Sequence, residues 1–564
     1  MTMLRNTLTA GVLAVAAVGL AWTQLGGMAN QEWSTSGGDA QRSAWIRKDP
    51  LISKAAMATG KFGFLWKLQL NNQARQRTYF SNPALVGNAM GFKGFRSLTV
   101  LTAPSNTVFA VDNDFGTLYW DKHFEVAVPT TSTAACPGGM TAAASRITNP
   151  NPASFLPRGP IIRSPYRGAL GEPGAGAQTD AAYLPGGGGR ANAAGRGASP
   201  DAGRGGAAPA TAAGAGRAGG RGRGLSTPTG AQPIAVLSSD GVLHFVSPVS
   251  AKELLKPVPF IPANANATDL SWVSGMVYTA TINECGGIPN GVWGIDPLAD
   301  SPTAVSWKTQ GGSVVGTIAF GSEGIIYAAI GAGRTPDGGF ANAVVALDPQ
   351  TLQVKDWFTQ AGANFVSTPV VFQRGGKDLL ATASADGRIF LLDGASLGGA
   401  DHKTPLQVTA AQTDSQTSVV AAGFASWEDE GGVRWLLMPS TTGSGAITAY
   451  RLKAGATPSL DKVWTSREMV APLPPIVVNG IVYAAASGEF APGDAAVSNA
   501  ERAKRSSPAV LYALDGATGK EIWNSGKTMA TFAHGTGLSS SPGQVYLTTS
   551  DNVMYAFGMP YERQ

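Results

Sequence analysis

Short stretches of alternating apolar and polar residues recur along the whole chain, separated by tight turns. The clearest copy is Val510–Trp523, VLYALDGATGKEIW, which opens with a period of two. Asp515 begins a turn because its carboxylate can accept backbone N–H bonds, and Gly519 supplies the left-handed residue that closes the turn. A second strand ends at Trp523, a large apolar ring suited to fill the space between two sheets. The pattern therefore predicts a β-hairpin.

Eight copies of this hairpin can be identified, some without the tryptophan. Another apolar hairpin precedes most of them, such as Pro474–Ser487 or Ser367–Ser384. Each unit thus offers about four strands, and repetition at about 40–60 residues is typical of a β-propeller. The other copies are Val108–Trp120, Gly241–Leu254, Val292–Trp307, Val344–Trp357, Gly387–Gly399, Ile447–Trp464 and the truncated Asn552–Gly558.

The truncated last copy predicts how the ring closes. Asn552–Gly558 stops before its final strand, whereas Phe62–Leu70, FGFLWKLQL, is a lone strand ahead of the first complete unit. We therefore predict an all-β, eight-bladed propeller of four-stranded antiparallel blades, closed by this N-terminal strand as the outermost strand of the last blade. Such closure leaves no long sheet edge exposed.

Composition supports a folded, turn-rich body. The 564 residues include 73 glycines and 36 prolines, which fit many tight turns. Glycine-rich chains can be disordered, but 13 tryptophans and 43% apolar residues argue against that here.

The N-terminus is typical of a signal peptide. Arg5 precedes the apolar run Leu8–Trp22, which is too short for a comfortable membrane span, and small residues permit cleavage after Ala29. We assign residues 1–29 to this signal and expect a periplasmic or secreted protein without a transmembrane span after cleavage. An uncleaved anchor is the alternative.

Export makes the two cysteines, Cys136 and Cys285, a candidate disulfide, because the destination is oxidising. They lie in similar settings, ACPGG and ECGG, in regions that we interpret as neighbouring blades near the funnel mouth. Two separate buried thiols are the alternative.

A Gly/Ala/Arg-rich insert interrupts the propeller at 158–230, dividing it into residues 30–157 and 231–564. The insert holds nine arginines and three acidic residues, a net charge of +6, whereas the whole chain carries +5. Its few apolar residues cannot offset the entropy of ordering it, so we predict disorder. RGG-like tracts can bind nucleic acid, but an exported protein rarely meets any, and we expect no such partner.

The repeat and the mature start together resemble the quinoprotein alcohol dehydrogenase superfamily. Glu32–Ile52, EWSTSGGDAQRSAWIRKDPLI, is similar to that family's opening W…GGD…R stretch. The resemblance implies an eight-bladed propeller that binds pyrroloquinoline quinone and calcium. Glu284 lies near the place of the family's acidic calcium ligand, but we favour the simpler interpretation of a solvated hairpin glutamate.

Other positions depart from the family's pattern. Cys136 is followed by Pro137, so the family's adjacent cysteine pair is lost. A valine cannot stack beneath a quinone, an arginine cannot ligate calcium, and neither a glycine nor an asparagine can act as a general base. The residues at these apparent positions are Val315 for the stacking tryptophan, Arg334 for a calcium-ligating asparagine, Gly362 or Asn364 for the catalytic aspartate, and Gly394 for a cofactor-contacting arginine.

Other chemistries find little support, since the four histidines, His123, His244, His402 and His534, show no metal-site spacing. The glycines around His534 permit close backbone approach, yet a satisfied loop histidine also explains it. We therefore favour a non-catalytic propeller that binds a protein, glycan or small ligand at one face, with a degenerate quinone site and no catalytic residue. The alternative is a quinone- and calcium-dependent alcohol or sugar dehydrogenase with a divergent active site.

Overall fold

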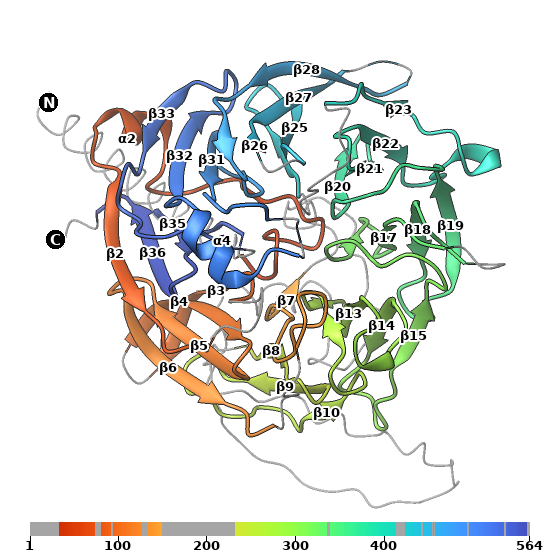
Figure 1. Cartoon of the computed structure of the whole chain (residues 1–564), viewed down its shortest axis with the longest axis horizontal. Coiled ribbons are helices and arrows are strands. Elements are labelled where there is room, and N and C mark those ends of the chain that lie inside the picture. The colour runs from red at the N-terminus through yellow and green to blue at the C-terminus, as the bar shows by residue number, and fades with distance from the viewer. Residues whose placement is uncertain are drawn as a thin grey trace, which may run out of the picture.

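The protein is described from a computed structural model. The predicted signal peptide and the predicted insert lie outside the residues that the structure describes. Eight sheets stand around a common axis and form a ring (Figure 1). The residues described are 33–73, 80–91, 94–126, 132–148, 232–334, 339–412, 423–441, 444–453, 455, 457–492, 494, 496–534 and 537–560.

The blades are antiparallel and mostly four-stranded, which confirms the predicted eight-bladed propeller. Each of the eight predicted hairpin copies contains the third strand of a blade, and most of them extend into the fourth. From the axis outward, the strands are β3 (Ala84–Gly91), β4 (Gly94–Ala103), β5 (Thr107–Asp112) and β6 (Thr117–His123) in blade 1; β8 (Ile234–Leu237), β9 (Val242–Val246) and β10 (Val258–Pro259) in blade 2; β12 (Ser271–Val273), β13 (Met276–Ile282), β14 (Gly291–Ile295) and β15 (Val305–Lys308) in blade 3; and β16 (Ala319–Phe320), β17 (Ile326–Ile330), β18 (Ala343–Leu347) and β19 (Val354–Thr359) in blade 4.

The second half of the ring repeats the plan. Its strands are β20 (Val370–Arg374), β21 (Lys377–Ala383), β22 (Ile389–Asp393) and β23 (Gln407–Val408) in blade 5; β24 (Ala425–Glu428), β25 (Arg434–Pro439), β27 (Ile447–Lys453) and β28 (Ser459–Thr465) in blade 6; β30 (Ile476–Val478), β31 (Ile481–Ala486), β32 (Val510–Asp515) and β33 (Glu521–Asn524) in blade 7; and β34 (Ser539–Ser541), β35 (Gln544–Thr548), β36 (Val553–Gly558) and β2 (Gly63–Gln69) in blade 8. Short elements outside this plan are β1 (Trp45–Ile46), β7 (Ile147–Thr148), β11 (Asn266–Ala267), β26 (Ser444–Gly445), β29 (Met469–Val470), α2 (Lys54–Ala58) and α4 (Asn499–Arg505).

Strand β2 closes the ring as predicted. It pairs antiparallel with β36, from Gly63 opposite Gly558 to Gln69 opposite Val553, and is the outermost strand of blade 8. The two ends of the propeller sequence therefore share one sheet, and the closed ring protects the sheet edges.

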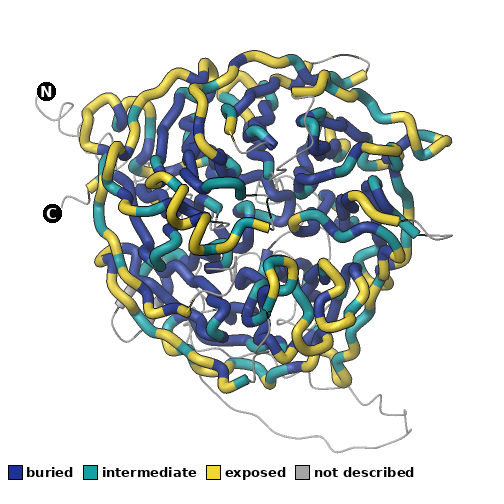
Figure 2. Tube along the Cα trace, viewed as in Figure 1, coloured by how far each residue is buried: buried dark blue, intermediate teal, exposed yellow. Residues whose placement is uncertain are grey.

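Burial explains the apolar pattern of the strands. All residues of β5, β31 and β36 are buried, because these middle strands lie between the neighbouring blades. The outermost strands β2 and β6 contain no fully buried residue and alternate between exposed and half-buried positions. Figure 2 shows this gradient from a buried interior to an exposed rim.

Tryptophans of the outermost strands join neighbouring blades, as the sequence predicts. Three of them, Trp66, Trp120 and Trp464, dock on a turn of the next blade and donate the indole N–H to a backbone carbonyl. Glycines with positive φ lie beneath two of these rings, Gly116 and Gly519, where a Cβ atom would come within 2.4 Å of the indole. The bonds join Trp66 to Asn113 (2.9 Å), Trp120 to Pro248 (2.7 Å) and Trp464 to Gly516 (3.1 Å).

Antiparallel order gives the ring two different ends. At the turn end, links join the first strand of a blade to its second and the third to its fourth. At the loop end, links join the second strand to the third and each blade to the next. Aspartates begin most of the outer turns at the turn end. As predicted for Asp515, its Oδ1 accepts the N–H groups of Ala517 and Thr518, both at 3.0 Å, and Asp348 accepts those of Gln350 and Thr351.

Blade 2 departs from the expected four strands. Ser145 forms an isolated antiparallel bridge with Ala235 of β8 and so occupies the innermost position of this blade. The next residues, β7, turn away and pair in parallel with β12 of blade 3. Because Thr148 and Gln232 flank the link between the first and second positions of the blade, the insert joins the ring at its turn end.

Residues 33–49, the axial strap, run through the centre of the ring (red-orange in Figure 1). They make at least one hydrogen bond to every blade, and one bond to each blade can be followed in chain order. This order explains why the W…GGD…R stretch precedes the first blade. The bonds link Trp33 to Leu85, Ser34 to Arg146, Thr35 to Leu270, Ala40 to Phe320, Gln41 to Val371, Ser43 to Ser426, Ala44 to Val477 and Asp49 to Gly543.

Candidate functional site

Most of the predicted site residues gather at the loop end. Glu284 lies between β13 and β14, Val315 between β15 and β16, and Arg334 between β17 and β18. Gly362 and Asn364 lie between β19 and β20. The links that carry them belong to blades 3 to 5, so the topology brings distant sequence positions to one end of the ring.

Glu284 stands on a tight turn at this end. Asn283 and Glu284 have φ of 62° and 51°, in a left-handed region that non-glycine residues seldom occupy. The backbone N–H of Glu284 donates to Asn290 Oδ1 at 3.1 Å, and Asn283 N–H donates to Ser313 Oγ at 3.2 Å. Glu284 is exposed, and within the described part of the chain its carboxylate makes no hydrogen bond or ion pair. A solvated hairpin glutamate fits this geometry.

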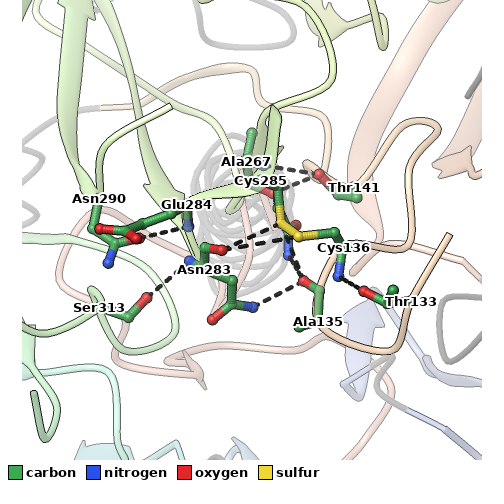
Figure 3. The surroundings of a disulfide bond; sticks show 11 residues. Thr133, Ala135, Cys136, Thr141, Ala267, Asn283, Glu284, Cys285, Asn290 and Ser313 are labelled. Atoms are coloured by element: carbon green, nitrogen blue, oxygen red, sulfur yellow. Dashed lines mark hydrogen bonds between the residues drawn. A yellow bond between two sulfur atoms is a disulfide. The ribbon is translucent and has the colours of Figure 1, made fainter. Parts of the chain in front are cut away.

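The disulfide between Cys136 and Cys285 is present, which confirms this predicted pair (Figure 3). The Cα atoms are 5.4 Å apart and the sequence separation is 149 residues. The carbonyl oxygen of Ala135 accepts from Asn266 Nδ2 at 2.9 Å and from Asn283 Nδ2 at 3.0 Å. The bridge therefore clamps the segment that leads into blade 2 onto the Glu284 turn of blade 3.

The structure places Gly394 at the other end. Gly394 follows β22 in a link between third and fourth strands, and its carbonyl accepts from Tyr327 Oη at 3.0 Å. The assignment of Gly394 to the cofactor-contacting arginine is therefore wrong, because that position faces the turn end. The loop-end turn of the same blade does contain an arginine, Arg388, whose Nε lies 2.8 Å from Asp386 Oδ2.

The residues at the loop end do not fit pyrroloquinoline quinone and calcium. Val315 is half-buried against the backbone of Gly331 and offers no flat ring. Arg334, which the sequence resemblance matches to a calcium-ligating asparagine, is exposed and cationic, whereas calcium takes about six to eight oxygen ligands. Among the described residues, no three His, Cys, Asp or Glu side chains are grouped to hold a metal ion.

A second group of side chains lies at this end, Glu489, Arg502 and His534, and the sequence did not predict that these three would come together. Glu489 lies between β31 and β32, and His534 lies on the link from blade 7 to blade 8. His534 Nδ1 is 2.6 Å from Glu489 Oε1, and Arg502 Nη1 is 3.3 Å from the same oxygen. The Glu489 and Arg502 side chains are 4% and 1% exposed, whereas that of His534 is 14% exposed. The glycines beside His534 were the one sequence signal for this group.

Polar side chains from different blades and from the axial strap meet near the loop end. Asn82 Oδ1 accepts Gly537 N–H at 2.6 Å, and its Nδ2 donates to Asp269 Oδ2 at 3.2 Å. Deeper in the ring, Arg42 donates to the carbonyl of Ile318 at 2.8 Å. Burial lowers the pKa of Arg42 to about 10, although the Asp269 carboxylate opposes this shift. Arg42 therefore ties the strap to the link that leads into blade 4.

The architecture is similar to that of known quinohemoprotein alcohol dehydrogenases. The structure matches a quinohemoprotein alcohol dehydrogenase from Comamonas testosteroni with a TM-score of 0.52 and 12% identity, over 95% of this chain and 82% of that one. It matches quinohemoprotein alcohol dehydrogenase ADHIIG from Pseudomonas putida HK5 with a TM-score of 0.50 and 11% identity, over 95% and 81%. The chain has a quinoprotein alcohol dehydrogenase-like fold.

This likeness concerns the fold alone, since both identities are low. No protein-family model matches the sequence, and no curated protein matches it significantly. None of the helices in the described ranges is long and apolar enough to cross a membrane. What the loop end does must therefore be argued from its own residues.

Proposed function

We propose that the protein is an exported, quinoprotein-like propeller that binds a ligand or partner at its loop end without quinone redox chemistry. The observation that carries this proposal is the residue set at that end. By the sequence resemblance, Val315, Arg334 and Gly362 take the positions of the stacking tryptophan, a calcium ligand and the catalytic base, and none of the three has the chemistry for that role. The partner is a protein, a glycan or a small molecule.

Export is part of this proposal. The Cys136–Cys285 disulfide suits an oxidising compartment such as the periplasm or the extracellular space. The N-terminal signal predicted from the sequence supports the same destination. Mass spectrometry of the mature protein tests both the disulfide and the removal of the signal peptide, and we expect cleavage after Ala29.

A titration with pyrroloquinoline quinone and calcium tests the absence of redox function. We expect no tight saturable quinone binding and no reduction of an artificial electron acceptor with short alcohols or sugars. Stoichiometric quinone binding together with dye reduction would overturn the proposal.

The dehydrogenase with a divergent site is the second candidate, favoured by Glu284 alone. Its exposed carboxylate stands at the loop end beside the disulfide. Should dye reduction be found, Glu284→Gln is the first variant to make, and it should abolish the calcium dependence of the reaction.

A further inference from the structure

We propose that Arg47 and Arg434 form the centre of a binding site for a small multivalent oxyanion at the turn end of the ring. This site lies at the opposite end from the one in the proposed function and does not depend on it. The starting point is the indole of Trp45, because the guanidinium carbons of Arg47 and Arg434 lie 4.5 and 5.4 Å from the centroid of its ring.

Two separate parts of the chain bring these arginines together. Arg47 belongs to the axial strap and stands two residues before Asp49, whose carboxylate accepts the N–H of Gly543 in the first turn of blade 8. Arg434 is the first residue of β25, after the turn that joins it to β24 in blade 6. Both arginines therefore lie at the turn end.

The two guanidinium groups are close enough to influence each other. Burial lowers the pKa of Arg434, the Glu428 carboxylate opposes this shift, and the positive charge of Arg47 adds to it. Burial also lowers the pKa of Arg47, against the opposing charges of Asp39 and Glu428. Because arginine stays protonated in proteins, two partly desolvated positive charges stand side by side.

Several N–H donors of this pair have no partner among the described residues. Arg434 donates through Nη2 to Glu428 Oε2 at 2.8 Å, but its Nε is buried and bonds no described group. Arg47 is half-buried and makes no hydrogen bond or ion pair with any described residue. A guanidinium that stacks on a ring keeps its donors in its own plane, so Trp45 leaves them available. An oxyanion supplies several acceptors at once, in charge-assisted hydrogen bonds.

The two carboxylates that act on Arg47 already bond elsewhere. Asp39 accepts the backbone N–H of Ser43 at 2.9 Å and also its Oγ–H, and Glu428 is held by Arg434. Neither lies within ion-pair distance of Arg47. The positive charge of Arg47 is therefore open to an added anion.

Ser426 and Arg374 extend the site. Ser426 is two positions before Glu428, so both lie on one face of β24, and Glu428 pairs with Arg434. Ser426 is fully buried, and its Oγ has no hydrogen-bond partner in the described part of the chain. Arg374 ends β20, the innermost strand of blade 5, which lies beside β24. It is half-buried and bonds no described residue. A third cation and a hydroxyl favour an anion with more than one negative charge.

Arg467 provides a matched control at the other end. Its guanidinium carbon also lies over an aromatic ring, 4.9 Å from the centroid of Tyr512, and its Nη1 is 2.8 Å from Glu521 Oε2. Arg467 follows β28 and so lies at the loop end. A purely structural role predicts small changes in melting temperature for both Arg47→Gln and Arg467→Gln, and no dependence of either on anions.

Calorimetry and thermal scans of the mature protein at constant ionic strength test the proposal, with phosphate, pyrophosphate, succinate and citrate as probes. We expect saturable binding of at least one probe with a dissociation constant of about 1 mM or below, weakened about tenfold or more by Arg47→Gln and unchanged by Arg467→Gln. The bound anion should raise the melting temperature of the unmodified protein and of Arg467→Gln, but not that of Arg47→Gln. Binding by the phosphates alone or by the carboxylates alone identifies the source of the oxyanion. Since Arg47 has no described hydrogen bond to lose, its variant should fold.

Two outcomes would overturn the proposal. Absence of saturable binding by all four probes would exclude the ligand class and leave the arginines a structural role. Binding that Arg47→Gln leaves unchanged would place the anion elsewhere on the protein. Neither outcome bears on the loop end, whose proposed function fails separately, by tight quinone binding with dye reduction.

Discussion

The two ends of the ring are held together by different kinds of contact. At the turn end, Asp515 and Asp348 accept hydrogen bonds from residues two and three positions further along the chain. At the loop end, Asn82 bonds Gly537, 455 residues away, and the disulfide joins positions separated by 149 residues. The turn contacts recur from blade to blade, whereas each of these two loop-end contacts occurs at one place. Long-range contacts also reach the turn end, such as that of Asp49 with Gly543.

This difference shows where the ring can vary. A turn that satisfies its own N–H groups can be copied in every blade, since it depends on no distant residue. The loop end must be assembled from separate links and the axial strap, so each contact there is particular to one place. Chemistry that differs from that of the fold's relatives is therefore expected at the loop end.

Removing the Arg42 hydrogen bonds that join the axial strap to the loop end should have the largest effect on stability. Arg42→Met removes a side chain that is 4% exposed and leaves buried acceptors, including the Ile318 carbonyl, without their donor. We expect a loss on the order of 3–5 kcal/mol in unfolding free energy, measured by denaturant titration. Arg47→Met, which removes a half-buried cation lying over Trp45, is the control and should cost far less. Equal losses for both variants would show that the strap is not anchored at Arg42.

Opening the disulfide tests the other long-range contact of the loop end. The variant with Cys136→Ser and Cys285→Ser frees a loop of 149 residues, for which the chain-entropy estimate is roughly 4–5 kcal/mol as an upper figure. We expect a loss of about 2–4 kcal/mol and a lower melting temperature, and reduction of the unmodified protein should give the same shift. Peptide mapping without reductant should find a single linked pair. Two freely alkylated thiols in the native protein would contradict the bridge.

A glycine substitution tests the turn end. Gly519→Ala forces a side chain into a position with φ of 71°, where its Cβ would lie 2.4 Å from the Trp464 ring. We expect a loss of about 1–3 kcal/mol, because the alanine is strained and also displaces the docked indole. Gly526→Ala is a matched control, with φ of 55° and only a 4.0 Å contact to Asn524. Its backbone strain alone should cost less, and the difference between the two melting temperatures measures the packing of the tryptophan.

The fold could be predicted because its signals are local. The Asp515 turn, the left-handed Gly519 and the closing strand near Trp66 each follow from a few adjacent residues, and the structure confirms them. Blade 2 was the exception, since its innermost position is filled by Ser145, from the far side of the insert. No local pattern marks that pairing.

The site could be predicted only in part, for the same physical reason. Glu284 was expected in a turn of the third blade and lies there, whereas Gly394 was matched to a site position although it lies at the turn end, because its place in the sequence does not reveal which way its strand runs. Glu489 and Arg502 gave no signal at all, since their meaning arises only where two links meet His534. Contacts between links of different blades leave no repeating pattern in the sequence by which they could be recognised.

Removing the insert should have the smallest effect on the melting temperature. This test sharpens the comparison between the two ends of the ring. The flanking residues Thr148 and Gln232 lie at the turn end. The entropic cost of closing a loop grows only with the logarithm of its length, so a long insert costs on the order of 1–2 kcal/mol relative to a short linker. Replacing residues 158–230 by a short Gly/Ser linker should leave the melting temperature nearly unchanged in a thermal scan. As a control at the loop end, replacing 491–505 removes Arg502 from Glu489 and should lower the melting temperature clearly. Loss of soluble expression on removing 158–230 would mean that the insert packs against the propeller.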